Sequence, residues 1–443
     1  MTLPLPFFED LVEEKSRTNG NANKIDAQDR AFHNWYRFVL SFPPHLVRDY
    51  LDEFATKKNG VVLDPFCGTG TTLVESKLRG ISSVGIEANS FAHFASKIKT
   101  NWEIDPDLLL NQSKEVAEIA ISKLQKQGIN DKVPFTGNID SLCLRQLPED
   151  ENKLILTGSI SPLPLHKIIV LLETLRAFES TRVYEHQLLA LSNALVFKIS
   201  NLHFGPEVGV GKPKSDIPVI SIWLSDIKKM VDDLRLVADK VHANSVVELA
   251  DARNLDEVLQ QKSVDVVITS PPYPNEKDYT RITRLESVIL GFINNKSDLR
   301  ELKKGLLRSN TRNVYKGDDD DKWVEDNAEI QQIANTIETK RMELGKTSGF
   351  EKQYARVTKL YFGGMARHLA SLRPALRPNA HLAYVVGDQA SYLRVMIRTG
   401  KILGDIAKEL GYDVVRTDLF RTRLATATRE QLREEVVILR WKG

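Results

Sequence analysis

The chain has 443 residues, of which 42% are hydrophobic, and it carries a net charge of +2. This length suits one enlarged catalytic domain with an inserted recognition region, and the near-neutral charge argues against a uniformly basic nucleic-acid binder. Two cysteines exclude a disulfide framework, and no metal-ligand spacing is present, so no metal is predicted. The sequence has neither an apolar run of about 20 residues nor a signal-peptide pattern, so we expect a cytoplasmic protein.

The first informative element is segment 61–72, VVLDPFCGTGTT, in which an apolar strand ends at an acidic residue and runs into a glycine turn. Gly68 and Gly70 permit a tight turn and close approach of the backbone to a ligand, and the N–H groups at the start of the following helix favour an anion. Leu73 stands where the dinucleotide pattern requires a third small residue. A nicotinamide or flavin dinucleotide is therefore disfavoured.

Two later apolar segments also end in acidic residues. Segment 83–86 leads to Glu87, about 20 residues past the glycines, where the ribose-binding rule expects a carboxylate. Segment 245–249 leads to Asp251. Because ligands sit at the carboxyl ends of strands in open α/β sheets, these residues predict a doubly wound α/β fold with its site at that edge.

Segment 264–273, VDVVITSPPY, ends a further apolar strand with Ser270, Pro271, Pro272 and Tyr273. The two prolines fix φ and remove two N–H donors. This leaves the Ser270 hydroxyl and the Pro271 carbonyl free to accept hydrogen bonds from a ligand, beside the flat face of Tyr273. The pattern predicts a clamp for a planar group that bears an amine, although a strand that simply ends in a proline turn would look the same.

Segment 281–316, directly after this motif, holds nine basic and three acidic residues, a net charge of +6. Neutralisation of DNA phosphates and a solvated helix face are both compatible with it. The run GDDDDK at 317–322 is expected to form a solvent-exposed loop. The candidate DNA-binding residues are Arg281, Arg284, Arg300, Lys303 and Lys304.

Together the motifs resemble those of the amino-methyltransferases, which use S-adenosylmethionine to methylate the exocyclic amine of cytosine or adenine in DNA. DPFCGTG matches their cofactor motif, and SPPY matches their catalytic motif, whose serine form is most often found in cytosine-N4 enzymes. Segments 41–46, 369–388 and 421–441 resemble the N-terminal cofactor segment, the helix–strand unit after the catalytic motif and the closing hairpin. The cofactor motif precedes the catalytic motif, the reverse of the order common in serine-type cytosine enzymes, so adenine N6 remains open.

The resemblance implies methyl transfer to a base flipped out of double-stranded DNA, most often cytosine N4, by a prokaryotic or phage-encoded restriction-modification enzyme. A cognate restriction endonuclease would then be a partner. The alternatives are a methyltransferase for RNA or protein amides and a non-catalytic DNA-recognition subunit. The implied catalytic residues are Ser270, Pro271, Pro272 and Tyr273, and the implied cofactor-binding residues are Phe42, Pro43, Asp64, Phe66, Gly68, Gly70, Glu87 and Asp251, with Glu87 on the ribose, Asp251 on the adenine amine, and Asp64, Gly68 and Gly70 at the methionine end.

Two inserts interrupt the motifs. Helical spacing of apolar residues recurs over 108–127, 165–202 and 219–243, with a glycine- and proline-rich loop at 204–214. The predicted organisation is a first catalytic part at 1–100, a mainly helical insert for target recognition at 101–244, the catalytic motif at 245–293, a charged insert for DNA contact at 294–349, and the rest of the catalytic domain at 350–443.

Overall fold

The computed structural model describes residues 29–38, 41–54, 59–139, 142–205, 207–239, 243–275, 277–347, 349–424 and 430–443. Within these ranges, no helix is both long enough and apolar enough to cross a membrane. The whole N-terminal cofactor segment, 41–46, and the whole SPPY motif lie inside the described part.

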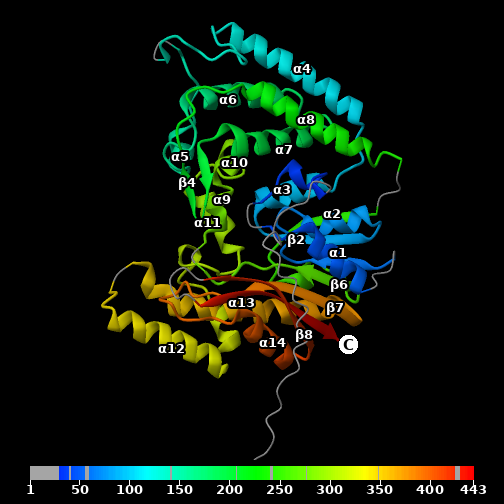
Figure 1. Cartoon of the computed structure of the whole chain (residues 1–443), viewed down its shortest axis with the longest axis vertical. Coiled ribbons are helices and arrows are strands. Elements are labelled where there is room, and N and C mark those ends of the chain that lie inside the picture. Colours follow the sequence, from blue (N-terminus) through cyan, green and yellow to red (C-terminus); the bar gives the residue numbers. More distant parts are fainter. Residues whose placement is uncertain are drawn as a thin grey trace, which may run out of the picture.

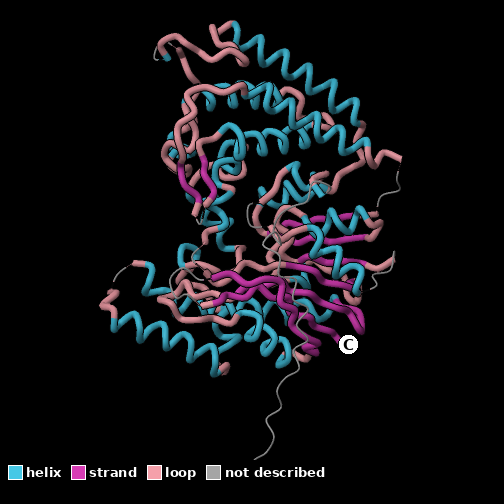
Figure 2. Tube along the Cα trace, in the orientation of Figure 1, coloured by secondary structure: helices cyan, strands magenta, loops and turns pink. Residues whose placement is uncertain are grey.

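A seven-stranded sheet in the order β5-β2-β1-β6-β7-β9-β8 forms the centre of the molecule (Figures 1 and 2). β1 pairs in parallel with β2 on one side and with β6 on the other, and β9 alone runs antiparallel to its neighbours β7 and β8. The order therefore reverses between β1 and β6, which confirms the predicted doubly wound α/β fold. The strands are β1 Val61–Asp64, β2 Ser82–Glu87, β5 Ser245–Leu249, β6 Val264–Thr269, β7 Leu376–Gly387, β8 Asp413–Leu424 and β9 Gln431–Trp441.

Both faces of the central strands are buried, because successive side chains of a strand point to opposite faces. Val62 and Val266 belong to the same apolar cluster as residues of helix α1 (Pro44–Glu53). Leu63 and Val267 pack instead with helices α13 (Tyr354–Leu372) and α14 (Thr399–Glu409) on the other face. This double burial explains why these strands are continuous apolar runs in the sequence.

The insert at 101–244 is mainly helical and stacks over the side of the sheet that carries α3 (upper part of Figure 1). Phe91 and Phe94 of α3 join the apolar core that these helices share. Strands β3 and β4 form a two-stranded antiparallel sheet, and β4 with the last residue of β3 lies inside 204–214, so the prediction of a loop there is wrong in part. The elements on this side are α2 Thr71–Leu78, α3 Ser90–Lys99, α4 Pro106–Gln125, α5 Glu149–Asn152, α6 Pro162–Arg176, α7 Tyr184–Ala194, η4 Leu195–Ile199, β3 Leu202–Phe204, β4 Val208–Val210 and α8 Val219–Arg235.

The second insert follows the catalytic motif and crosses to the opposite side of the molecule, where α12 packs on α13 (Figure 1). Ile330 and Ile337 of α12 are fully buried in the core of that side. The elements are α9 Tyr279–Ile282, α10 Arg284–Ile289, α11 Lys296–Lys304, η6 Thr311–Asn313, η7 Asp320–Val324, α12 Ala328–Glu343 and η8 Phe350–Gln353, with short turns η2 His33–Trp35, η5 Leu255–Glu257 and η9 Arg373–Ala375 elsewhere.

Candidate functional site

A cleft of about 290 Å³ opens where four parallel strands end. Its walls are residues 65–69 after β1, 86–89 at the end of β2, 250–252 after β5 and 270–273 after β6. This is the point at which the strand order reverses, the usual ligand site of an open α/β sheet. The glycine turn, the acidic strand ends and SPPY, which are far apart in the sequence, therefore share one cavity.

The turn after β1 has the backbone geometry that its glycines predict. Gly68 and Gly70 have positive φ angles of +52° and +82°, and a Cβ atom on Gly70 would lie 2.6 Å from the Ser96 hydroxyl. Asp64 is fully buried, and its Oδ1 accepts hydrogen bonds from Thr269 Oγ1 at 2.6 Å and Phe66 N at 3.1 Å. Asp64 thus braces the turn against β6 from behind the cleft.

Glu87 holds the turn from the neighbouring strand. Its Oε2 accepts from the backbone N–H of Gly68 at 2.8 Å, and its Oε1 accepts from that of Asn89 at 2.7 Å. Burial raises the pKa of Glu87 to about 7, although both backbone donors favour the charged form. Each carboxylate oxygen retains a lone pair for a further donor in the cleft.

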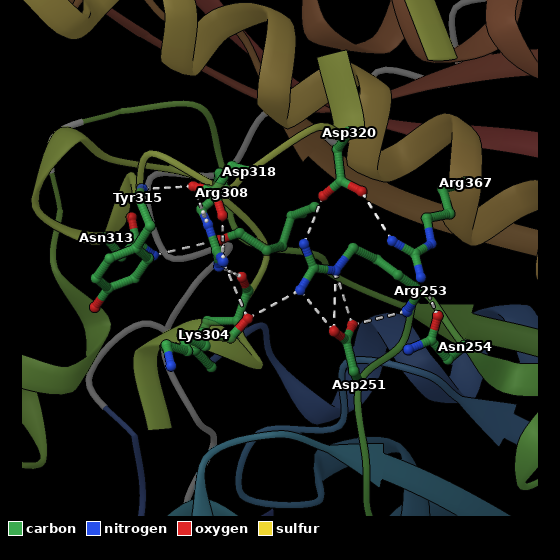
Figure 3. Close-up of polar contacts among 12 residues, drawn as sticks. Asp251, Arg253, Asn254, Lys304, Arg308, Asn313, Tyr315, Asp318, Asp320 and Arg367 are labelled. Atoms are coloured by element: carbon green, nitrogen blue, oxygen red, sulfur yellow. Dashed lines mark hydrogen bonds and ion pairs between the residues drawn. The ribbon is translucent and has the colours of Figure 1, made fainter. Parts of the chain in front are cut away.

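Asp251 reaches the cleft at the end of β5 and is held by Arg253 (Figure 3). Arg253 Nη2 lies 2.6 Å from Asp251 Oδ2, and Arg253 Nε lies 3.0 Å from each carboxylate oxygen. On its other side, Arg253 Nη1 lies 2.5 Å from Asp320 Oδ2. Asp320 also pairs with Arg367 at 3.2 Å. A buried chain of charges therefore connects the cofactor wall to the second insert.

This chain of charges corrects the prediction for the acidic run at 317–322. Asp320 is only 3% exposed, and Asp318 pairs with the buried Arg308, whereas Asp319 is exposed. The packing is close, because a Cβ atom on Gly363 of α13 would lie 1.9 Å from the Asp320 carbonyl oxygen. The run thus fixes the second insert through Asp318 and Asp320, and the prediction of a solvent-exposed loop is wrong in part, because Gly317, Asp319 and Lys322 are exposed.

The fastened segment, residues 305–324, forms a further wall of the cleft. Ser309, Asn310 and Asn313 line the cavity together with the turn at 305–307. Asn310 Nδ2 also donates to the Lys277 carbonyl at 3.1 Å. The motifs gave no indication of these residues. The adjacent glycines 363 and 364, unusual inside a helix, were the only sequence signal of close packing there.

Ser270 and Tyr273 face the cleft opposite the cofactor motif. Ser270 Oγ donates to the Val385 carbonyl of β7 at 3.2 Å and also hydrogen-bonds with the Tyr273 side chain, and its oxygen keeps one lone pair as an acceptor. The Tyr273 ring lies close to the backbone of β7, since a Cβ atom on Gly387 would be 2.9 Å from Tyr273 Cε2. Burial raises the pKa of Tyr273, so its hydroxyl stays protonated.

The predicted basic face divides into two groups. Arg300 and Lys304 are exposed on α11, with Arg300 over the Tyr315 ring at 5.5 Å. Lys303 points inward and pairs with Asp278 at 2.8 Å, so its expected place on the exposed face is wrong. Arg281 and Arg284 are half-buried. Because neighbouring charged residues of a helix can point inward and outward, a count of charges in the sequence could not separate the buried basic residues from the exposed ones.

Residues 10–97 match a family model described as DNA methylase. Over 97% of its length the chain is 26% identical to the Type II methyltransferase M.BsoBI of Geobacillus stearothermophilus, of which 88% is covered. It is 23% identical to the Type II methyltransferase M.AvaI of Nostoc sp., with 95% of the chain and 87% of the relative covered. M.MvaI of Kocuria varians, also a Type II methyltransferase, is 20% identical over 85% of the chain and 81% of its own length. These similarities confirm the predicted resemblance to DNA amino-methyltransferases and, with it, S-adenosylmethionine as the cofactor.

Proposed function

We propose that this protein is a site-specific DNA methyltransferase of a restriction-modification system that methylates N4 of a flipped cytosine. The observation that carries the proposal is the single cleft in which Glu87 and Asp251 face Ser270 and Tyr273. Adenine N6 is the alternative target, because cytosine and adenine present the same amine beside a ring nitrogen. The serine at position 270 favours cytosine.

The cleft fits the cofactor. Glu87 offers free acceptor lone pairs for the ribose hydroxyls, and Asp251, fixed by Arg253, can accept from the adenine amine. Phe42, Phe66 and Gly68 line the same wall. Pro43, Asp64 and Gly70 are absent from the lining. We therefore assign Asp64 and Gly70 to the shape of the glycine turn and Pro43 to the start of α1, and none of them to contacts with the methionine end. When bound, S-adenosylmethionine supplies a methyl group that is already activated by its sulfonium.

The catalytic residues are then needed to position the target amine. An amine conjugated to its ring is a weak nucleophile, because its lone pair is delocalised. Ser270 Oγ, which donates its own proton to Val385, and the Pro271 carbonyl would both accept from the amine, favouring a pyramidal nitrogen aimed at the methyl group. Tyr273 would stack on the flipped base and offset part of the unstacking cost of a few kcal/mol. Pro272 keeps this turn free of a competing N–H donor.

The product identifies the function. DNA from cells that express the protein would be sequenced for modified bases, and digested DNA would be analysed by mass spectrometry, with Ser270→Ala as the control. We expect N4-methylcytosine at one recognition sequence. N6-methyladenine would select the alternative base, and 5-methylcytosine would overturn the mechanism, because carbon methylation requires a cysteine nucleophile that SPPY does not supply.

A labelling assay with the same protein tests the two other functions. Purified enzyme with tritiated S-adenosylmethionine should label DNA and leave RNA and protein unlabelled. Label in RNA or protein would indicate an amide or RNA methyltransferase. Cofactor binding without labelling of any DNA would indicate a non-catalytic recognition subunit.

A further inference from the structure

A second hollow lies beside the main cleft and gathers positive charge. Arg281 of α9, Arg284 of α10 and Arg312 of η6 line it, together with Lys303 of α11 and one acidic residue, Asp278. Asp278 also lines the main cleft, so the two cavities share a wall. The hollow is therefore next to the place where the target base would lie.

The one carboxylate of this arginine hollow is fully occupied. Asp278 Oδ2 accepts from Lys303 Nζ at 2.8 Å, and its Oδ1 accepts from Thr280 N at 3.1 Å and Thr280 Oγ1 at 2.7 Å. Four cations and one anion leave the hollow with a net charge of +3. The surplus charge belongs to the three arginines.

These arginines form no direct ion pair with an acidic residue in the part of the chain that the structure describes, although Asp278 lies near Arg284. Arg284 donates only to neutral oxygens, those of Thr280 and the Leu154 carbonyl. Arg312 has its Nη1 buried without a hydrogen-bond partner in the described chain, and its guanidinium lies over the Phe350 ring at 5.5 Å. Burial lowers the pKa of Arg284, Asp278 partly offsets this effect, and the nearby Arg281 lowers the pKa further. Because half-buried, unpaired cations are costly, such a group indicates that an anion belongs between them.

We propose that the arginine hollow binds one phosphodiester group of the DNA strand beside the flipped nucleotide. Planar guanidinium groups match the oxygens of a phosphate and bind it through paired hydrogen bonds. A nucleotide whose base enters the main cleft carries its phosphates outside that cleft, and the hollow is the adjoining cationic cavity, with Asp278 common to both. The hollow thus fixes the position of the extruded nucleotide without reading its base. This inference rests on the proposed function.

The test pairs the loss of one phosphate charge with the loss of the arginines. The DNA duplexes would carry the recognition sequence that the enzyme methylates. Each phosphate near the target nucleotide would be replaced in turn by a neutral methylphosphonate, and binding would be measured by fluorescence anisotropy. With the wild-type protein, one position should weaken binding roughly tenfold or more. With Arg281→Gln/Arg312→Gln, the same substitution should change affinity less than about twofold, since the contact is already gone. The double variant should also lower the salt slope by about one unit per lost contact.

Arg182→Gln, an exposed change on the helical insert, is the matched control and should leave the methylphosphonate effect intact. If the double variant does not fold, Arg281→Gln alone replaces it in the cycle. If the effects of the methylphosphonate and of the arginine substitutions are additive while the wild-type enzyme methylates DNA, the phosphate site in the hollow is refuted and the proposed function stands. Saturable binding of inorganic phosphate together with additive effects would make it a site for free anions and overturn it equally. A wild-type protein that methylates no DNA would instead refute the proposed function.

Discussion

Replacement of Asp320 should loosen the second insert and weaken cofactor binding, whereas replacement of its neighbour Asp319 should do neither. The two residues are adjacent in the acidic run but differ in environment. The Asp320 side chain is 4% exposed and contacts the guanidinium groups of Arg253 and Arg367. Asp319 pairs only with Lys322, at 3.2 Å, and both of these side chains are well exposed.

These environments set the expected magnitudes. Removal of one partner of a buried ion pair costs about 3–5 kcal/mol when the remaining charge is left unpaired, and the cost of removing Asp320 should lie below that range because Arg253 keeps its contacts with Asp251. An exposed pair contributes about 0.2–1 kcal/mol. Asp320→Ala should therefore lower the free energy of opening of the fastened segment several times more than Asp319→Ala. Because Arg253 also holds Asp251, the affinity for S-adenosylmethionine should fall with it.

Hydrogen exchange followed by mass spectrometry measures the free energy of opening of residues 305–324, and calorimetry measures cofactor affinity. Asp319→Ala is the matched control for both. Equal effects of the two substitutions would refute the idea that the buried charge chain fastens this segment. Faster exchange in Asp320→Ala with unchanged cofactor affinity would refute the connection to Asp251.

Three further outcomes are expected. Ionised Glu87 is the form that accepts from the ribose, so the affinity for the cofactor should fall as the pH drops through about 7. Glu87→Gln should flatten this pH dependence in calorimetry. The raised pKa of Glu87 also stabilises the cofactor-free fold at low pH, and this contribution is lost as the pH rises through about 7. Ser270→Ala should lower turnover with cofactor affinity nearly unchanged, while Tyr273→Ala should weaken capture of the target nucleotide by about 1–3 kcal/mol in DNA-binding assays; loss of cofactor binding in either variant would contradict these roles. Arg300→Ala with Lys304→Ala should flatten the salt slope of DNA binding by about one unit per lost contact, and an unchanged slope would make them a solvated face.

The parts of the site that the sequence predicts correctly are those governed by local rules. Apolar runs followed by polar ends predict the strands, since a buried parallel strand needs side chains of that kind on both faces. Glycines 68 and 70 predict the turn, because both adopt positive φ angles. Strand β8 begins at Asp413, well before the expected start of the closing hairpin at 421, because its early apolar residues, Val414 and Val415, are exposed and are followed by polar residues, so they show no pattern of burial.

The parts that sequence reasoning misses depend on distant partners. Arg253 and Asp320 are 67 residues apart, and nothing local distinguishes Asp320 from Asp319. Lys303 and Lys304 are adjacent as well, yet one is buried against Asp278 and the other is exposed. In both cases helix or turn geometry sends neighbouring charges in opposite directions, and only the fold determines which of them meets a buried counter-ion.

This sorting of charges also explains how a nearly neutral protein can present a DNA-binding face. The acids Asp278, Asp318 and Asp320 are held inside by Lys303, Arg308 and Arg253, so they cancel charge that never reaches the surface. The arginines of the hollow and Arg300 on the outer face of α11 have no such buried partner within the described part of the chain, and under the proposed function they would act on DNA directly, whereas Lys304 pairs with the exposed Glu301 at 2.7 Å. Net charge sums both groups, whereas DNA responds to the second alone, because screening limits each exposed charge to a range of about 10 Å. The location of unpaired cations therefore predicts the path of the DNA backbone better than the total of +2 does.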